Sequence, residues 1–268
     1  MFMRLFVSLI VATTALAALP ALAACPPGTR EQEGTTPKGL EKWCVDSNNF
    51  RHGPATVFYP GGQVKTEAQY EHGEEAGRWV HYHENGKKNR EGDYVKGKLA
   101  GQWTFWHDDG SLERKGAYDK EGKMHGPWPE WYPDGKKRQE AFYHHGELNR
   151  RLVRWYPDGT KAIEHHYRKG KRHGRFREWW PTGKLKLESH WKDGRALGLH
   201  RRFNEQGQLM SEISFKAGQR TGPSKLWHPN GKLRRVGHYR SGRKHGTFKE
   251  WTPAGKLLGE LKFEDGTG

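Results

Sequence analysis

Glutamate recurs at a fixed position along the chain, and repeated carboxylates could take part in acid–base catalysis. The members of this column lie five residues after a glycine and are Glu67, Glu91, Glu140, Glu164, Glu188, Glu212 and Glu260. Acid–base catalysis needs two carboxylates whose environments differ, whereas these positions are equivalent. Because lysine and arginine are their near neighbours, we expect cross-strand ion pairs that contribute under about 1 kcal/mol each.

Histidine could supply metal ligands, and the chain contains 16 of these residues. Three pairs are close in sequence: His81 and His83, His144 and His145, His165 and His166. His81 and His83 would share one face of a strand, as two zinc ligands could. Four further histidines directly precede a glycine and follow a repeated pattern: His52, His125, His173 and His245. We interpret the histidines as surface side chains and expect no metal site.

The motifs of the common enzyme classes do not occur in the sequence. It contains no glycine-rich phosphate-binding loop, no Gly-x-Ser-x-Gly turn and no His-Glu-x-x-His pair. We therefore expect no catalytic residue and no cofactor, and hence a protein that is not an enzyme.

Positive charge is the main chemical bias of the chain, with 47 Lys+Arg against 31 Asp+Glu and a formal net charge of +16. Many basic residues lie in expected loops or beside expected turns and are candidates for anion binding: Lys96, Lys98, Arg168, Lys169, Lys171, Arg172, Arg234, Arg235, Arg240, Arg243 and Lys244. A field of this kind attracts polyanions. A solvated basic surface without any anionic ligand is the open alternative.

Glycine punctuates the chain with a fixed period, which indicates internal repeats. Nine turn glycines lie 24 residues apart, with one interval of 25: Gly62, Gly86, Gly110, Gly135, Gly159, Gly183, Gly207, Gly231 and Gly255. An aromatic residue lies four residues before each: Phe58, Tyr82, Trp106, Trp131, Trp155, Trp179, Phe203, Trp227 and Trp251. Another lies eight residues after each: Tyr70, Tyr94, Tyr118, Tyr143, Tyr167, Trp191, Phe215, Tyr239 and Phe263. A further glycine opens every unit except the fifth, where Arg150 takes its place.

The segments between these glycines have the pattern of short β-strands. Pro133-Asp134-Gly135 is a tight-turn sequence, because proline presets φ and glycine accepts a positive φ. Beyond the turns, polar and apolar residues tend to alternate, as in half-buried strands. Small residues two positions before the second aromatic, such as Gly92 and Gly116, should leave room for a neighbouring ring. We predict an all-β fold: an elongated, twisted, single-layer antiparallel sheet of about nine consecutive 24-residue β-hairpins.

The first 23 residues have the pattern of an export signal. Arg4 precedes an apolar run too short to span a membrane, and Ala21-Leu22-Ala23 is typical of a cleavage site. Leu22-Ala23-Ala24-Cys25 also fits a bacterial lipobox, in which Cys25 would carry a lipid. We favour a disulfide between Cys25 and Cys44, because exported proteins meet an oxidising compartment. The protein would be periplasmic or extracellular, or in the alternative an outer-membrane lipoprotein.

The repeated residues resemble the MORN-variant repeat, a bacterial relative of the membrane occupation and recognition nexus motif. The resemblance is carried by an aromatic residue, an Asn/Asp-Gly-Lys turn, a tyrosine and a His-Gly-x-aromatic element, as in Trp227, Asn230-Gly231-Lys232, Tyr239 and His245-Gly246-Thr247-Phe248. It covers residues 53–268 and implies an open sheet of hairpins. Many family members carry the label of YwqK-type antitoxins.

These observations favour a non-catalytic exported repeat scaffold, with residues 24–52 as an N-terminal cap and residues 53–268 as the array. It would bind an unidentified protein, or an anionic polymer or lipid headgroup of the cell envelope, through its basic, aromatic-rich sheet. The alternative is an antitoxin or immunity protein that neutralises a toxin by surface binding. We expect a monomer without a transmembrane segment after cleavage. We do not expect nucleic acid as a partner, because the protein leaves the cytoplasm.

Overall fold

The computed structural model describes residues 23–36 and 39–267, and within them it has one open antiparallel sheet and no helix. Residues 1–22 of the expected signal peptide lie outside the described residues. In the part of the chain that the structure describes, no helix is long and apolar enough to cross a membrane. The strands are β1 (Arg30–Thr36), β2 (Gly39–Val45), β3 (Arg51–Phe58), β4 (Val64–Glu71), β5 (Glu74–Glu75), β6 (Gly77–Tyr82), β7 (Lys88–Val95), β8 (Lys98–Trp106), β9 (Leu112–Tyr118), β10 (Met124–Trp131), β11 (Lys137–His144), β12 (Glu147–Leu148), β13 (Arg150–Trp155), β14 (Lys161–Arg168), β15 (Lys171–Trp179), β16 (Leu185–Lys192), β17 (Arg195–Phe203), β18 (Leu209–Lys216), β19 (Gln219–Trp227), β20 (Leu233–Arg240), β21 (Arg243–Trp251) and β22 (Leu257–Phe263).

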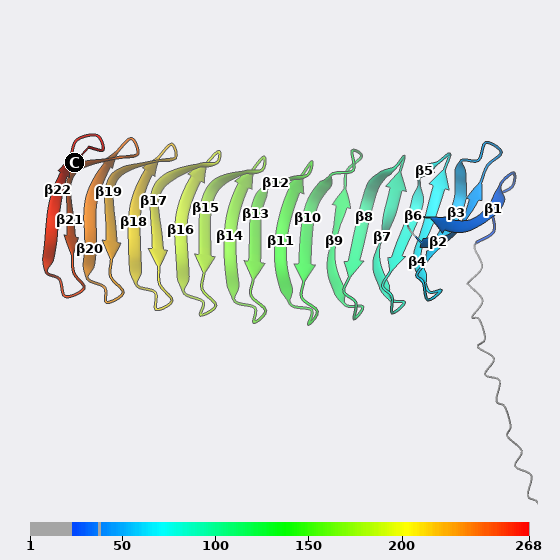
Figure 1. The fold of residues 1–268 in the computed structure, drawn as a ribbon, viewed down its shortest axis with the longest axis horizontal. Helices are drawn as coiled ribbons and strands as arrows, with labels where there is room; N and C mark the ends of the chain where they lie inside the picture. Colours follow the sequence, from blue (N-terminus) through cyan, green and yellow to red (C-terminus); the bar gives the residue numbers. More distant parts are fainter. Residues whose placement is uncertain (1–22, 37–38, 268) are drawn as a thin grey trace, which may run out of the picture.

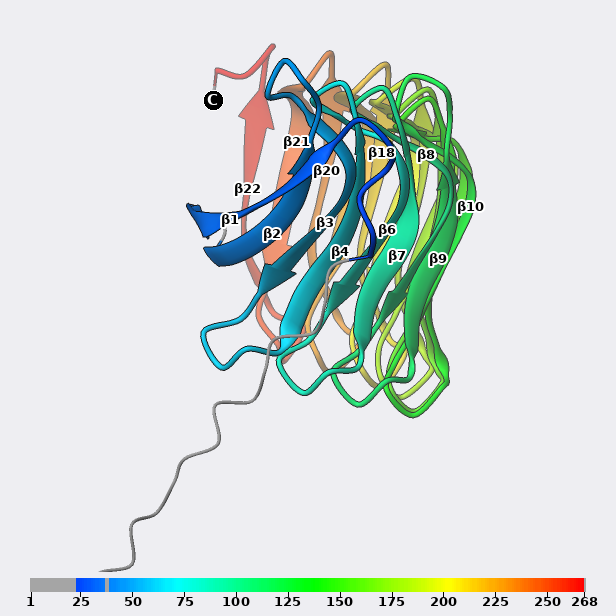
Figure 2. The ribbon, with the colours of Figure 1, turned by 90° about the vertical axis from the view of Figure 1, so that its right-hand side faces the viewer.

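The strands pair in sequence order, so the sheet is a meander from β1 to β22. The short strand β5 pairs with β4, as the following strand β6 does, and β12 pairs with β11, as β13 does. Each short strand therefore forms one row of the sheet together with the strand that follows it. Figure 1 shows the rows side by side along the long axis, and the view along the array in Figure 2 shows the sheet curving. The predicted architecture is confirmed, with nine hairpins from β3–β4 to β21–β22.

The turn inside each hairpin, at the lower edge in Figure 1, follows from its Pro-Asp-Gly or related sequence. In hairpin β10–β11 the N–H of Gly135 donates to the carbonyl of Tyr132 at 2.9 Å, and Gly135 has a φ of 80°. Asp134 accepts the N–H of Lys136 at 3.0 Å, and the Lys136 ammonium donates to the Pro157 carbonyl of the next turn at 3.3 Å. The Asx-Gly-Lys sequence therefore both forms a turn and ties it to its neighbour. The same link to the next turn is made by Lys87, Lys184 and Lys232.

The turns between hairpins, at the upper edge in Figure 1, are two-residue turns of the I′ kind, except for the longer turn at Asp119–Gly122 between β9 and β10. Lys169 and Gly170 illustrate them, with φ values of 49° and 69°. Type I′ requires a positive φ at both positions and matches the right-handed twist of the flanking strands. The N–H of Gly170 donates to the Leu148 carbonyl of the preceding upper turn at 2.9 Å, so the upper turns are also linked from one repeat to the next.

Irregular register in every repeat explains the curvature of the sheet. Strand pairing is interrupted inside each hairpin and again between hairpins, as at Phe105–Trp106 and opposite Gly92. Such β-bulges bend strands and increase their twist. The residue that opens each unit lies at the second irregularity with a positive φ, which glycine adopts without strain. Arg150 takes the same conformation at a φ of 61°, and its guanidinium lies 4.4 Å from the centre of the Phe142 ring.

The two faces of the sheet differ in chemistry. One face, which we call the ring face, carries one residue from each unit, two positions after the residue that opens the unit. This ring column consists of Ala55, Trp79, Trp103, Trp128, Leu152, Phe176, His200, Ser224 and Phe248. Its first tryptophans pack with the tyrosines of the second predicted aromatic column into the core of the molecule. The opposite face carries the glutamate column and the first predicted aromatic column. Lys88, for example, lies over the Trp106 ring and pairs with Glu91 at 2.7 Å.

Packing on the ring face depends on small residues in the preceding strand, as the sequence predicted. A β-carbon added at Gly92 would lie 2.3 Å from the Trp103 ring. One added at Gly116 would lie 2.2 Å from the Trp128 ring. Since both contacts are shorter than any real β-carbon contact, these tryptophans need a glycine beneath them.

The N-terminal segment extends the sheet. Its strands β1 and β2 form a hairpin, and β2 pairs with β3, so the cap is itself a β-hairpin rather than an irregular cover. A disulfide joins Cys25 and Cys44, whose Cα atoms are 5.6 Å apart. The edge strand β1 carries the charged residues Glu31 and Glu33, which discourage pairing with another chain.

Candidate binding groove and basic rim

The ring column loses volume toward the C-terminal half of the array. Trp79, Trp103 and Trp128 are 6%, 1% and 2% exposed and fill the face of their hairpins. The positions that follow in later hairpins are occupied by Leu152, Phe176, His200 and Ser224. Because a smaller side chain leaves space that the tryptophan would have filled, the ring face is hollowed there.

The hollow is a groove of about 1080 Å³ that runs over strands β14 to β19. Its apolar floor is formed by Phe176, Leu187, Trp191, Ile213 and Phe215. Its cationic side chains are Arg172, Lys186, Arg195, Arg202 and Arg220. Glu178 is the only carboxylate among the described residues that line it. The groove therefore combines aromatic surface with an excess of positive charge.

His200 lies in the middle of the groove at the position of a ring-face tryptophan. Its ring centre is 5.5 Å from that of Trp191 and 4.4 Å from that of Phe215. Nε2–H donates to the carbonyl of His190 at 3.1 Å. Burial lowers the pKa of His200, so the ring is neutral near pH 7 and offers Nδ1 as an acceptor.

Two arginines join the groove to the upper edge of the sheet. The Arg172 guanidinium lies 5.4 Å from the Phe176 ring centre and 4.7 Å from that of Trp191. Arg220 lies 5.4 Å from the ring centre of Tyr239. A guanidinium held beside an aromatic ring keeps N–H groups available for a carboxylate or phosphate.

The upper edge beside the groove is strongly basic, and we call it the basic rim. Four consecutive upper turns contribute Arg168, Lys169, Lys171, Arg172, Lys192, Arg195, Lys216, Arg220, Arg240, Arg243 and Lys244. Asp193 is the one carboxylate in these turns, and it is paired with Arg168 at 2.6 Å and His173 at 3.3 Å. The hydrogen bond from Arg168 lowers the pKa of Asp193, which therefore stays ionised.

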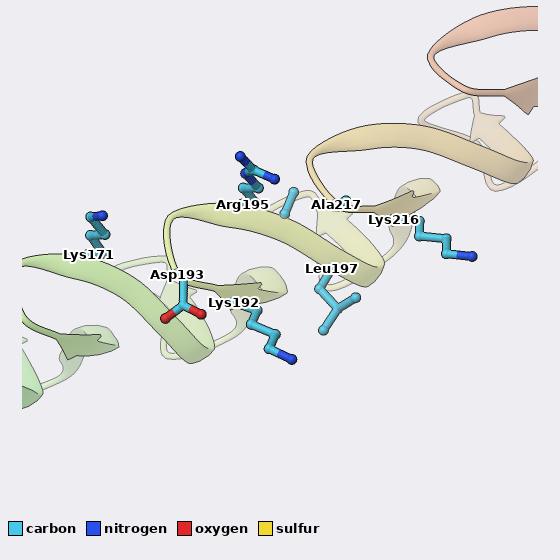
Figure 3. Close-up of a pocket in the computed structure, with 8 residues that line it drawn as sticks. Lys171, Lys192, Asp193, Arg195, Leu197, Lys216 and Ala217 are labelled. Carbon is cyan, nitrogen blue, oxygen red and sulfur yellow. The ribbon is translucent and has the colours of Figure 1, made fainter.

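Most of the rim is not neutralised by the protein itself. Within residues 23–36 and 39–267, no carboxylate lies within 4 Å of the charged groups of Lys171, Arg195 or Lys216. Figure 3 shows these side chains around a shallow pocket, with Lys171 and Arg195 extending to one side of the ribbon and Lys192 to the other. The rim therefore presents unpaired cations to solvent.

Several cations of the opposite face are paired with the glutamate column. Arg177 pairs with Glu188 at 2.8 Å, and Arg201 pairs with Glu212 at 2.9 Å. The other glutamates of the column make ion pairs as well, except Glu67, which accepts a hydrogen bond from Tyr82. Most glutamates of the column thus make the expected ion pairs, whereas the rim is the place where four consecutive turns bring cations together with a single carboxylate.

The structure brings some of the sequence-predicted anion-binding residues together and separates others. Arg168, Lys169, Lys171, Arg172, Arg240, Arg243 and Lys244 all lie in the basic rim. Lys96 and Lys98 lie in an upper turn nearer the N-terminus, three turns before the rim begins. Arg234 and Arg235 follow a lower turn, and Arg235 is bound by Glu250 of the adjacent strand. The rim therefore does not include Lys96, Lys98, Arg234 or Arg235.

Sequence reasoning missed four rim residues and the groove. Lys192, Arg195, Lys216 and Arg220 are dispersed in sequence, and only an alignment of the repeats shows that they lie at turns equivalent to that of Lys169. His200 departs visibly from the repeat pattern, but the pattern alone does not show that a cavity results. The predicted aromatic column from Phe58 to Trp251 lies on the opposite face and lines the groove only at Phe203.

Seven segments of the chain match the family described as MORN repeat variant: residues 51–72, 76–96, 124–145, 172–193, 196–217, 220–241 and 244–265. The two hairpins left out are the one that ends in the longer turn at Asp119–Gly122 and the one that contains Arg150. No curated protein matches the chain.

Among solved structures, the chain aligns with crystal structures of TcdB2-TccC3-TEV and TcdB2-TccC3-Cdc42. The sequence identities are 10% and 12%, and the TM-scores are 0.18 and 0.15. The alignments cover 89% and 87% of this chain but only 15% and 16% of those chains. At these scores the likeness says nothing about fold or function.

Proposed function

The chain belongs to the MORN repeat variant family, whose repeats are generally non-enzymatic binding or scaffold modules, and from this premise we propose that it is an exported scaffold that binds an anionic polymer of the cell envelope. The polymer lies in the groove and along the basic rim. The observation that carries this proposal is that the groove of about 1080 Å³ adjoins the row of unpaired cations, with Arg195 lining both.

The spacing of the rim favours an extended ligand. Adjacent strands lie about 4.8 Å apart, so equivalent turns recur about every 10 Å and the four turns of the rim span roughly 30 Å. A small anion would occupy only one turn. A polymer that carries recurring carboxylates or phosphates can meet several turns at once and gains affinity from each.

The groove supplies what a charged edge alone lacks. Aromatic floors bury flat apolar surface, and the arginines at its border can bind carboxylate or phosphate in a bidentate manner. His200 adds a neutral acceptor in the middle of the groove. This combination suits an acidic polysaccharide, in which apolar ring faces and anionic groups alternate.

Export is the second part of the proposal and rests on the sequence of residues 1–23 together with the disulfide. Stable disulfides belong to oxidising compartments. The pairing of Cys25 with Cys44 supports the disulfide over the lipoprotein, because a sulfur in a disulfide cannot also carry a lipid. We expect intact mass spectrometry of protein from the envelope fraction to show cleavage after Ala23, an oxidised cysteine pair and no acyl group. An added acyl mass on Cys25 would contradict the disulfide and favour the lipoprotein.

The polymer proposal predicts salt-dependent binding to polygalacturonate and none to neutral dextran. Replacing the exposed Lys171, Arg195 and Lys216 with glutamine should weaken that binding about 3- to 150-fold, at roughly 0.2–1 kcal/mol for each exposed charge. Titration calorimetry at low and high salt measures both effects. A matched triple variant outside the rim, with Lys115, Arg234 and Lys256 changed to glutamine, should bind as the wild type does. Equal losses in the two variants would reject the rim as the binding surface in favour of net charge.

A further inference from the structure

Three histidines gather at one upper turn, next to the basic rim but separate from it. They are His125 at the start of β10, His144 at the end of β11 and His145 in the turn that follows. The ring centres lie 5.3 Å apart for His125 and His144, 5.5 Å for His125 and His145, and 4.4 Å for His144 and His145. One nitrogen from each ring lies within 4.8 Å of one nitrogen of the others.

The repeat architecture explains why these histidines meet. In the four units that have a histidine before the opening glycine, this histidine contacts the turn residue 20 positions later. In two hairpins that residue is aspartate, as in His173 with Asp193 at 3.3 Å and His245 with Asp265 at 3.5 Å. In hairpin β10–β11 it is His145, and His144 stands beside it. Where those hairpins have one imidazole and one carboxylate, hairpin β10–β11 has the three imidazoles of His125, His144 and His145.

The preceding turn, which is one residue longer than its counterparts, supplies a carboxylate to the same place. His145 Nδ1 lies 2.7 Å from Asp119 Oδ2, and Glu121 lies 3.9 Å from the same nitrogen. Hydrogen bonds from the Lys123 N–H and the His145 ring lower the pKa of Asp119, which therefore stays ionised. When Nδ1–H donates to Asp119, Nε2 of His145 keeps its lone pair for a cation.

The third histidine has a nitrogen that the protein leaves unused. His125 Nδ1 is buried from solvent and has no hydrogen-bond partner among the described residues. A buried polar atom without a partner is costly and calls for an explanation. The ring that carries it lies beside those of His144 and His145, at 5.3 and 5.5 Å between ring centres, where a cation could satisfy it.

We propose that His125, His144 and His145 bind a divalent transition metal of the Zn²⁺ class, with Asp119 orienting His145 or serving as a fourth ligand. Neutral imidazoles suit Zn²⁺, Cu²⁺ and Ni²⁺ rather than Ca²⁺ or Mg²⁺. Zinc–nitrogen bonds are about 2.0–2.1 Å long, so ligand atoms that lie within 4.8 Å of each other converge by small rotations of exposed side chains. The sequence predicted no metal site because His125 and the His144–His145 pair are 19 residues apart and meet only through strand pairing.

The test is titration of the purified protein, free of any histidine tag, with ZnCl₂ in a calorimeter. We expect one Zn²⁺ per chain. The double variant His144→Gln/His145→Gln should abolish binding, and Asp119→Asn should weaken it about 10–100-fold, as loss of an orienting carboxylate does. His173→Gln, which removes a histidine paired only with Asp193, is the control and should leave the affinity unchanged.

Two results would overturn the inference. One is the absence of any Zn²⁺ binding by the wild-type protein. The other is binding that survives in the double variant with unchanged affinity and stoichiometry. Circular dichroism of each variant establishes that the sheet is intact, so loss of binding is assigned to loss of ligands. Because the measurement uses the metal alone, its outcome does not depend on the polymer proposal.

Discussion

Replacing Trp128 with alanine is expected to lower the free energy of unfolding by about 3–5 kcal/mol, the range for deleting a buried aromatic side chain. Trp128 is 2% exposed, lies over Gly116 and meets the Tyr118 ring edge-on at 5.2 Å. A single-layer sheet has no second layer to close the gap, so the cavity collapses poorly. Urea denaturation followed by circular dichroism measures the change.

The matched control is Trp106→Ala on the opposite face. Trp106 is only half-buried and is covered by the flexible Lys88 chain, so its loss should cost clearly less than that of Trp128. Gly116→Ala should itself be destabilising by about 1–3 kcal/mol because its β-carbon meets the Trp128 ring. In the double variant Gly116→Ala/Trp128→Ala that clash is absent, so the two costs should not add. Additive costs, or equal costs for the two tryptophans, would contradict ring-on-glycine packing.

Much of the fold could be predicted because the same turn sequences and small residues recur in successive repeats. Pro133-Asp134-Gly135 and its counterparts specify the lower turns, and nine copies at one period leave little doubt about the meander. The small residues before the second aromatic column indicated where rings would rest. Gly92 and Gly116 confirm this interpretation, with the Trp103 and Trp128 rings directly over them.

The assignment of residues to faces was harder, because irregular pairing shifts the alternation twice in every repeat. In β20 the sequence places Leu233, Gly237 and Tyr239 on one face, while Arg235 and Val236 look exceptional. The register skips between Leu226–Arg235 and Trp227–Leu233, so Arg234 is an extra residue and the simple alternation does not extend through it. Arg235 therefore stays on the face of Gly237 and Tyr239, whereas Leu233 lies beyond the extra residue and does not follow the same alternation. Period-two reasoning cannot locate such a skip.

Properties that arise between repeats were also beyond the sequence. The rim brings together residues that lie 24 positions apart in the sequence. The groove forms because successive repeats lack the tryptophan of the ring column, and no motif marks it. The ring column and the residue beneath it vary together, with Gly116 under Trp128 but Ile213 preceding Ser224. A large side chain on one strand thus accompanies a small one on its neighbour, which becomes visible only when the pairing of β18 with β19 is known.

The second large effect is expected from filling the groove. His200→Trp restores the side chain that the ring column carries at Trp79, where the residue beneath is Ala68 rather than glycine. Ser189, which lies beneath position 200, is of similar size, so the ring should fit without a severe clash. Because His200 is neutral near pH 7, the substitution leaves the charge of the rim unchanged.

The most direct test of the binding account compares wild type and His200→Trp for affinity to polygalacturonate by titration calorimetry at low salt. The account predicts a loss of at least about tenfold, or ~1.4 kcal/mol, while the free energy of unfolding is maintained or raised. An unchanged affinity in a folded His200→Trp protein would contradict it, because the polymer would then not occupy the groove.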